Sequence, residues 1–215
     1  SGNNGTLING PTFDSSYNNS ILFDGSNDWV TTSNITLGNG NILWTVSTWV
    51  KTTTVVNSLG AGSILSNASG GPVSSSLCVN GGKIAYWIYQ NNSWSQKIGT
   101  ITVNDNKWHN LVWVNNSNYT MNMYVDGVLD TYVPNSTSGN NNPVDRIGGS
   151  WAGSFGGRIA NITIYKNKAL TENEILYNYN ALKHRYSLVF GYEMDNTNSY
   201  KGEPTTNIFP RSSTS

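Results

Sequence analysis

The sequence predicts an all-β fold, a two-sheet antiparallel β-sandwich with one short C-terminal helix, and three observations support this. Short apolar or alternating runs are broken about every 8 to 15 residues by Gly, Asn, Asp or Ser, the pattern of antiparallel strands joined by turns. The polar residues are mostly Asn, Ser, Thr and Gly, which favour turns and strands over helices. Eight Trp and twelve Tyr provide bulky side chains for a core.

The strands are expected in the runs of apolar and β-branched residues between these turn signals. The first 19 residues are rich in turn formers, and we expect them to reach the first core strand as an extended loop. The predicted strands are 20–25, 28–32, 44–52, 62–67, 76–81, 83–90, 94–101, 108–115, 119–127, 128–133, 145–150 and 157–165.

One helix is expected over residues 170–186. Thr171 is followed three residues later by Glu174, which is the spacing of a capping box. Apolar residues then recur at helical spacing, at Ile175, Leu176, Tyr179 and Leu182. The pattern predicts a short amphipathic helix that lies on the sandwich.

The chain is predicted to contain one sandwich domain, residues 1–186, followed by an extended tail, residues 187–215. The tail begins with an alternating apolar run, Leu188 to Met194, and continues with a proline- and hydroxyl-rich stretch without period. A single strand cannot bury its own apolar side, so we expect this run to dock on the domain or on a neighbour.

Composition excludes several classes of partner. Twelve basic and twelve acidic residues cancel, which leaves no basic surface of the kind that binds nucleic acid. There is no apolar run of membrane-spanning length, so membrane insertion is not expected. The single cysteine, Cys78, lies in an apolar run and is expected to be a small buried side chain.

The segment from Asn106 to Val133 contains the residues that most resemble a catalytic or metal-binding group. Asp126 and Gly127 stand between apolar strand residues, which is the strongest short signal for a β-hairpin turn. His109 alternates with Trp108, so it lies on one face of an ordinary strand. We therefore interpret His109 and Asp126 as parts of the scaffold.

No enzyme is predicted. The sequence has no Gly-x-Ser-x-Gly motif, and His184 lies between Lys183 and Arg185 on a basic, solvated part of the helix. Glycoside hydrolysis needs two carboxylates that face each other across a cleft. Of the four glutamates, two belong to the start of the helix and two to the tail, and no strand carries two acids on one face.

No metal site is predicted, although one loop offers a weaker calcium alternative. Asp24, Asn27 and Asp28 supply oxygen ligands of the kind that calcium accepts. The same residues fit a polar loop between two strands, which is the interpretation we favour. No cofactor is expected.

Glycan binding is the positive functional hypothesis, because two tryptophans lie in polar, turn-rich segments. Trp94 stands in "QNNSWSQ" and Trp151 in "GGSWAGSFGG". Sugars stack on aromatic rings, and large aromatic residues in loops often bind ligands. The alternative is that each indole covers the core from above.

Five segments in order resemble laminin-G-like, concanavalin A-like jelly-roll domains: "SILFDGSNDWV", "TVSTWVKT", "DNKWHNLVWV", "MYVDGVL" and "FGGRIANITIYKNKALTENEI". The resemblance covers about residues 20 to 186. It implies two antiparallel sheets packed face to face, with the Trp-His strand and the Asp-Gly hairpin as markers of the fold. Members of this family bind sugars or proteins or act as spacers, and some hold calcium.

The segments at both ends resemble those that flank such domains in bacteriophage virion proteins. The resemblance implies a non-enzymatic structural or adhesion module on a virion surface or another extracellular surface. Its expected partners are neighbouring subunits or modules and cell-surface glycans. A secreted bacterial adhesin or filament subunit is the alternative. A carbohydrate-active enzyme is disfavoured, because the strand of closely spaced acids found in glucanase relatives is missing.

Overall fold

A computed structural model of the chain describes residues 5–38, 40–57, 62–67, 75–90, 93–134, 143–150 and 153–187. The chain divides into two units, Ser1–Tyr177 and Asn178–Ser215. All the strands described below belong to the first unit, and the second begins inside the helix. The predicted tail beyond residue 187 lies outside the described residues, so the boundary at 186 stays a prediction.

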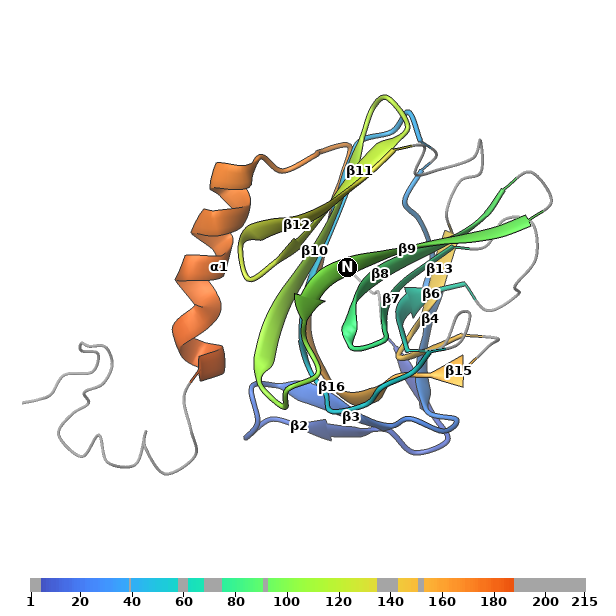
Figure 1. Cartoon of the computed structure of the whole chain (residues 1–215). Coiled ribbons are helices and arrows are strands. Elements are labelled where there is room, and N and C mark those ends of the chain that lie inside the picture. Colours follow the sequence, from blue (N-terminus) through green and yellow to red (C-terminus); the bar gives the residue numbers. More distant parts are fainter. Residues whose placement is uncertain are drawn as a thin grey trace, which may run out of the picture. The chain divides into compact units, whose positions relative to one another are not determined.

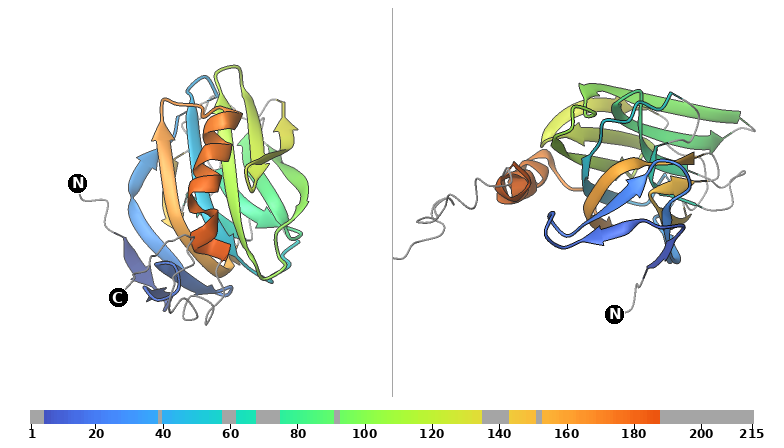
Figure 2. Two further views of the ribbon diagram at one scale, coloured as in Figure 1. Left: turned by 90° about the vertical axis from the view of Figure 1, so that its left-hand side faces the viewer. Right: turned by 90° about the horizontal axis from the view of Figure 1, so that it is seen from below.

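The described strands form two seven-stranded antiparallel sheets stacked face to face (Figures 1 and 2), which confirms the predicted sandwich. A short pair, β14 (Gly149–Ser150) and β15 (Gly153–Ser154), accompanies them. Sheet A has the order β1 (Thr6–Ile8), β4 (Trp29–Thr36), β13 (Pro143–Ile147), β6 (Ser63–Ser66), β7 (Ser75–Asn80), β8 (Lys83–Gln90), β9 (Ser93–Thr102). Sheet B has the order β12 (Val128–Val133), β11 (Thr120–Val125), β10 (Trp108–Asn116), β5 (Trp44–Lys51), β16 (Gly156–Lys166), β3 (Ser20–Asp24), β2 (Thr12–Asp14).

The core lies between the two sheets, and β10 shows how the sequence builds it. Successive side chains of a strand point to opposite faces. Leu111 and Trp113 are therefore buried in the main core, while Val112 and Val114 lie on the outer face of sheet B. The Trp113 indole N–H donates to the Ala85 carbonyl of sheet A at 3.0 Å, so its one polar atom is satisfied inside the core.

The helix α1 (Glu172–Ser187) begins with the predicted capping box. The Glu174 N–H donates to Thr171 Oγ1 at 3.3 Å, and the Thr171 N–H donates to Glu174 Oε2 at 2.9 Å. Ile175 is buried and packs with Leu170 on the outer side of sheet B. Leu176, the next residue, is 43% exposed, so the first turn of the helix contacts the sheet through Ile175.

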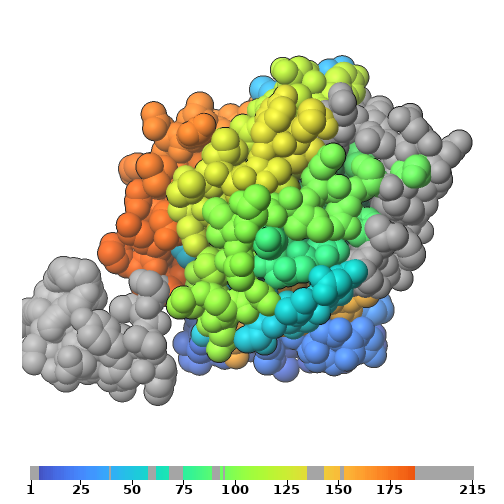
Figure 3. All heavy atoms as spheres, in the orientation of Figure 1, coloured from blue at the N-terminus to red at the C-terminus, as the bar shows by residue number. Residues whose placement is uncertain are grey.

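At one side of the sandwich the edge strands β9 and β12 lie against each other, and Figure 3 shows their atoms in contact. Asp130 of β12 joins them. Its carboxylate accepts hydrogen bonds from the Thr100 N–H at 2.9 Å, the Thr100 hydroxyl at 2.7 Å and the Ile101 N–H at 2.8 Å. A Cβ at Gly99 would overlap this carboxylate, so a larger residue there would have to displace Asp130 from its hydrogen bonds.

The N-terminal segment departs from the expected loop. It forms two short strands, β1 paired with β4 and β2 paired with β3. Three-residue strands are too short to show a period of two. Their pairing depends on partner strands, one of them more than twenty residues away, so the local pattern could not reveal it.

Candidate functional site

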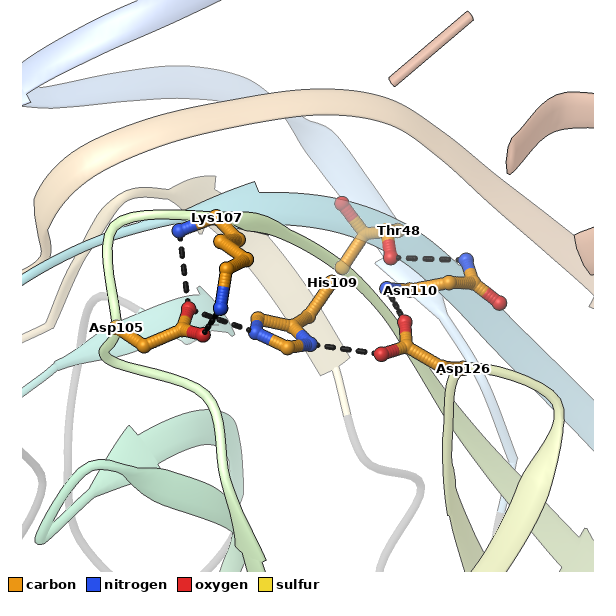
Figure 4. Close-up of polar contacts among 6 residues, drawn as sticks. All are labelled: Thr48, Asp105, Lys107, His109, Asn110 and Asp126. Carbon is orange, nitrogen blue, oxygen red and sulfur yellow. Dashed lines mark hydrogen bonds and ion pairs between the residues drawn. The ribbon is translucent and has the colours of Figure 1, made fainter. Parts of the chain in front are cut away.

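His109, which looked most like a catalytic residue, is held between two carboxylates (Figure 4). Its Nδ1 lies 2.7 Å from Asp126 Oδ2, and its Nε2 lies 3.0 Å from Asp105 Oδ1. Asp126 also accepts the Asn110 N–H at 2.8 Å, and Lys107 pairs with Asp105 at 2.7 Å. The imidazole is only 12% exposed. The two ring nitrogens therefore link the β11–β12 turn, through Asp126, to the β9–β10 loop, through Asp105.

The charge state of His109 follows from these contacts. Burial favours the neutral imidazole, but the hydrogen bonds to Asp126 and Asp105 outweigh it and raise the pKa above its usual value. Burial also opposes the charge on Asp105, and the bonds from Lys107 and His109 overcome it and lower the pKa of that carboxyl. These carboxylate partners favour the protonated imidazole. Both ring nitrogens face carboxylate oxygens, so neither is directed at a metal or a substrate.

The loop proposed as a calcium alternative uses its carboxylates to close a turn. Asp24 Oδ1 accepts the Ser26 N–H at 2.7 Å, and Asp28 Oδ2 accepts the Asp24 N–H at 3.0 Å. Asp28 is 3% exposed, and the Asn27 carbonyl accepts the Asn9 side-chain amide at 2.9 Å. Within the described residues, no group of three His, Cys, Asp or Glu side chains could hold a metal ion.

Cys78 is fully buried on β7, as expected for a small core side chain. It packs with Ala85 and Trp87 in a small cluster separate from the main core. Burial raises the pKa of its thiol, which keeps it protonated and unreactive.

Of the two tryptophans predicted to bind glycans, the structure describes only the backbone of Trp94. Trp94 is the second residue of β9 and pairs with Tyr89 of β8, so its backbone lies in a strand rather than a loop; the position of its side chain is not described. Trp151 lies outside the described residues. Both residues remain predictions as ligand contacts.

The structure brings together a group that the sequence did not indicate, which we call the Tyr17 platform: Tyr17, Lys51, Trp108 and Arg158. Lys51 lies opposite Trp108 on one side and opposite Arg158 on the other, so the three share the outer face of sheet B. Tyr17 extends over this row from the β2–β3 turn. Its hydroxyl accepts a hydrogen bond from Lys51 Nζ at 2.8 Å.

Both cations of the platform lie near the Tyr17 ring. The Arg158 guanidinium carbon is 4.2 Å from the ring centroid, and Lys51 Nζ is 5.4 Å from it. The ring of Trp108 lies 6.2 Å from that of Tyr17, tilted by 37°. Arg158 also pairs with Asp14 at 3.3 Å. These residues come from four separate parts of the chain: strand register aligns Lys51, Trp108 and Arg158, and the β2–β3 turn adds Tyr17.

Comparison with known proteins agrees with this architecture. The model of a family described as the concanavalin A-like lectin/glucanases superfamily matches residues 24–176, most of the chain. The chain therefore belongs to this family. No curated protein matches the sequence. Among the described residues, no helix is long and apolar enough to cross a membrane.

Several solved structures share the fold at low sequence identity. One is the binding domain of botulinum neurotoxin DC in complex with rat synaptotagmin II, with a TM-score of 0.63 and 14% identity over 84% of this chain. Another is the binding domain of Paraclostridial Mosquitocidal Protein 1, with a TM-score of 0.62 and 17% identity over 83% of this chain. This chain covers 47% of each of them, about half their length. A third structure comes from work on botulinum neurotoxin type C, whose cell entry depends on interaction with two ganglioside molecules. It has a TM-score of 0.63 and 12% identity, over 84% of this chain and 46% of that one.

Proposed function

We propose that this chain is a non-enzymatic binding module of an extracellular assembly and that it attaches to cell-surface glycans. Membership of the concanavalin A-like lectin/glucanases superfamily is the observation that carries the proposal. The structural neighbours support it: two are binding domains, one of them in complex with synaptotagmin II, and a third comes from a neurotoxin whose cell entry depends on interaction with two ganglioside molecules. Binding to another molecule is what these descriptions share.

The roles of the described carboxylates support the absence of catalysis. Six aspartates accept hydrogen bonds from backbone N–H groups and so stabilise turns or strand ends; they are Asp14, Asp24, Asp28, Asp105, Asp126 and Asp130. A glycosidase instead needs one carboxyl group free to donate a proton and a second to attack or to activate water. If the chain released reducing sugar from a bound oligosaccharide, with mass spectrometry as the readout, this part of the proposal would fail.

A glycan array tests the binding function and the two predicted tryptophans together. The intact chain should bind a subset of glycans, and Trp94→Ala or Trp151→Ala should weaken that binding. Tyr132→Ala is the matched control, since it removes an aromatic ring that is 57% exposed on β12, away from both tryptophans in sequence. Unchanged binding by both tryptophan variants would show that these residues are not the contacts. No binding to any glycan would remove the glycan part of the proposal.

We place the module on a virion surface, on the resemblance of its end segments to those of bacteriophage virion proteins. The second candidate is a secreted adhesin or filament subunit, favoured by the alternating run Leu188 to Met194, which would add a strand to a neighbouring copy. Deletion of residues 187–215 separates the two. A filament subunit would lose assembly, measured by light scattering, whereas a virion module would keep its glycan binding and its oligomeric state.

A further inference from the structure

We propose that the Tyr17 platform binds a saccharide unit that carries a carboxylate. The inference rests on the proposed function, because it names the ligand class and the site of a module that binds glycans. It follows from the charges of Lys51 and Arg158, from the two aromatic rings beside them, and from the strand register that places these cations side by side on the outer face of sheet B.

The charge of the platform favours an anion. Among the described residues, Lys51 has no carboxylate partner, and its ammonium donates to one acceptor, the neutral Tyr17 hydroxyl. Two of its three N–H donors are therefore available to a ligand. Arg158 uses Nη1 for both Asp14 at 3.3 Å and the Ser20 hydroxyl at 3.1 Å, which leaves other donors of its guanidinium. Two cations face one acid, so the platform carries a net positive charge.

Partial burial makes this charge effective. Lys51, Arg158 and the two rings are all half-buried, so part of the water that would screen the cations is displaced by side chains. A hydrogen bond between an ionised donor and a carboxylate is about twice as strong as a neutral one. Arg158 can also present two parallel N–H groups, which matches the two oxygens of a carboxylate.

The rings and their neighbours favour a sugar over a small inorganic anion. Tyr17 and Trp108 supply aromatic surface for the apolar face of a pyranose ring. The row continues across the next two strands: Arg158 pairs with Leu22 of β3, and Leu22 pairs with Thr12 of β2. Both are exposed, so an apolar side chain and a hydroxyl extend the surface past the cations. Neighbouring strands lie about 4.8 Å apart, so the row is long enough for an acidic sugar unit at the cations and for the hydroxyls of an adjoining unit beyond them.

The alternative is that Tyr17 only fastens the β2–β3 turn to sheet B. Its contacts with Lys51 and Arg158 would then stabilise the fold, and no ligand affinity would depend on them. The two interpretations differ in one measurable quantity, the preference of the intact chain for an acidic over a neutral sugar.

Calorimetric titration of the full chain with 3′-sialyllactose, a hyaluronan tetrasaccharide and neutral lactose tests the inference. At least one acidic probe should bind about tenfold or more tightly than lactose, the gain expected from hydrogen bonds to charged groups. Its affinity should fall with added salt, because the site is partly open to solvent. Lys51→Gln should remove most of this preference. Lys166→Gln is the matched control, since it removes an exposed lysine from the neighbouring strand β16 and should leave the affinity unchanged.

The outcomes separate the inference from the proposed function. Equal binding of acidic and neutral sugars by the intact chain would overturn the acidic site and leave a glycan-binding module. A preference for acidic sugars that survives Lys51→Gln would place that recognition elsewhere and also overturn the inference. If array and calorimetry detect no glycan at all, the proposed function fails together with it. The comparison of probes on the intact chain needs no variant, so it stands even if Lys51→Gln does not fold.

Discussion

Replacing His109 by glutamine tests the inference that the protonated form of this residue stabilises the fold. The imidazole is 12% exposed and makes two hydrogen bonds, from Nδ1 to Asp126 at 2.7 Å and from Nε2 to Asp105 at 3.0 Å. A hydrogen bond to a charged group contributes about 1.5–3 kcal/mol when its partners are largely buried. Asp105 is 34% exposed and already paired with Lys107, so its share is below about 1 kcal/mol. His109→Gln should therefore lower the free energy of unfolding by about 2–3 kcal/mol near pH 6.

The pH dependence gives this prediction its sign. Burial opposes the protonated form, but the bonds to Asp126 and Asp105 raise the pKa of His109 in the folded chain. A group with a raised pKa holds its proton more tightly when folded. Its stabilisation is complete below the unfolded pKa of about 6.5 and is lost as the pH rises through the folded value. Each unit of elevation is worth about 1.4 kcal/mol.

Urea denaturation at intervals from pH 6 to 9, followed by tryptophan fluorescence, measures both effects. The free energy of unfolding of the unmodified chain should decrease over this range, and that of His109→Gln should change less. His184→Gln removes the other, exposed histidine and should behave as the unmodified chain. An equal decrease in His109→Gln and the unmodified chain would refute the reasoning, because another group would then be responsible.

Three further substitutions test other contacts by the same denaturation assay. Gly99→Ala should cost about 1–3 kcal/mol, because its Cβ overlaps the Asp130 carboxylate; a neutral effect would mean that β9 and β12 separate without cost. Asp130→Ala should lower the free energy of unfolding by about 1–2 kcal/mol, since it leaves the Thr100 and Ile101 donors without their shared acceptor. The double variant with Gly99→Ala should lose less than the sum of the two single losses, because the two residues are in contact. Thr171→Ala should cost about 1 kcal/mol through loss of the helix cap, and a change below about 0.3 kcal/mol would argue that Glu174 alone holds the first turn.

The parts of the fold that the sequence predicted are those set by local rules. The turn at Asp126 and Gly127 has φ values of 53° and 83°, the left-handed conformation that the Asp-Gly pair favours. The faces of β10 follow from alternation, and the capping box at Thr171 from a spacing of three. Each of these depends on a few neighbouring residues.

The contacts that the sequence did not reveal depend on loops and on register. Asp105 and Asp126 both reach His109, but only after the β9–β10 loop and the β11–β12 turn have folded toward the same imidazole. Tyr17 and Arg158 are far apart in the chain and meet because β3 pairs with β16 at one particular register. No propensity or motif encodes that register; the burial of alternate residues across the whole sheet does.

The start of β10 holds both Trp108 of the Tyr17 platform and His109 with its two carboxylate partners. Trp108 and His109 are consecutive, so they point to opposite faces of sheet B. The hydrogen bonds that His109 makes to Asp126 and Asp105 fix its imidazole, and the Asn110 N–H that donates to Asp126 fixes the backbone beside it. The indole of Trp108, on the other face, lies 6.2 Å from the Tyr17 ring. We therefore expect His109 and its carboxylate partners to act indirectly. They would position the Trp108 ring, which belongs to the proposed ligand site.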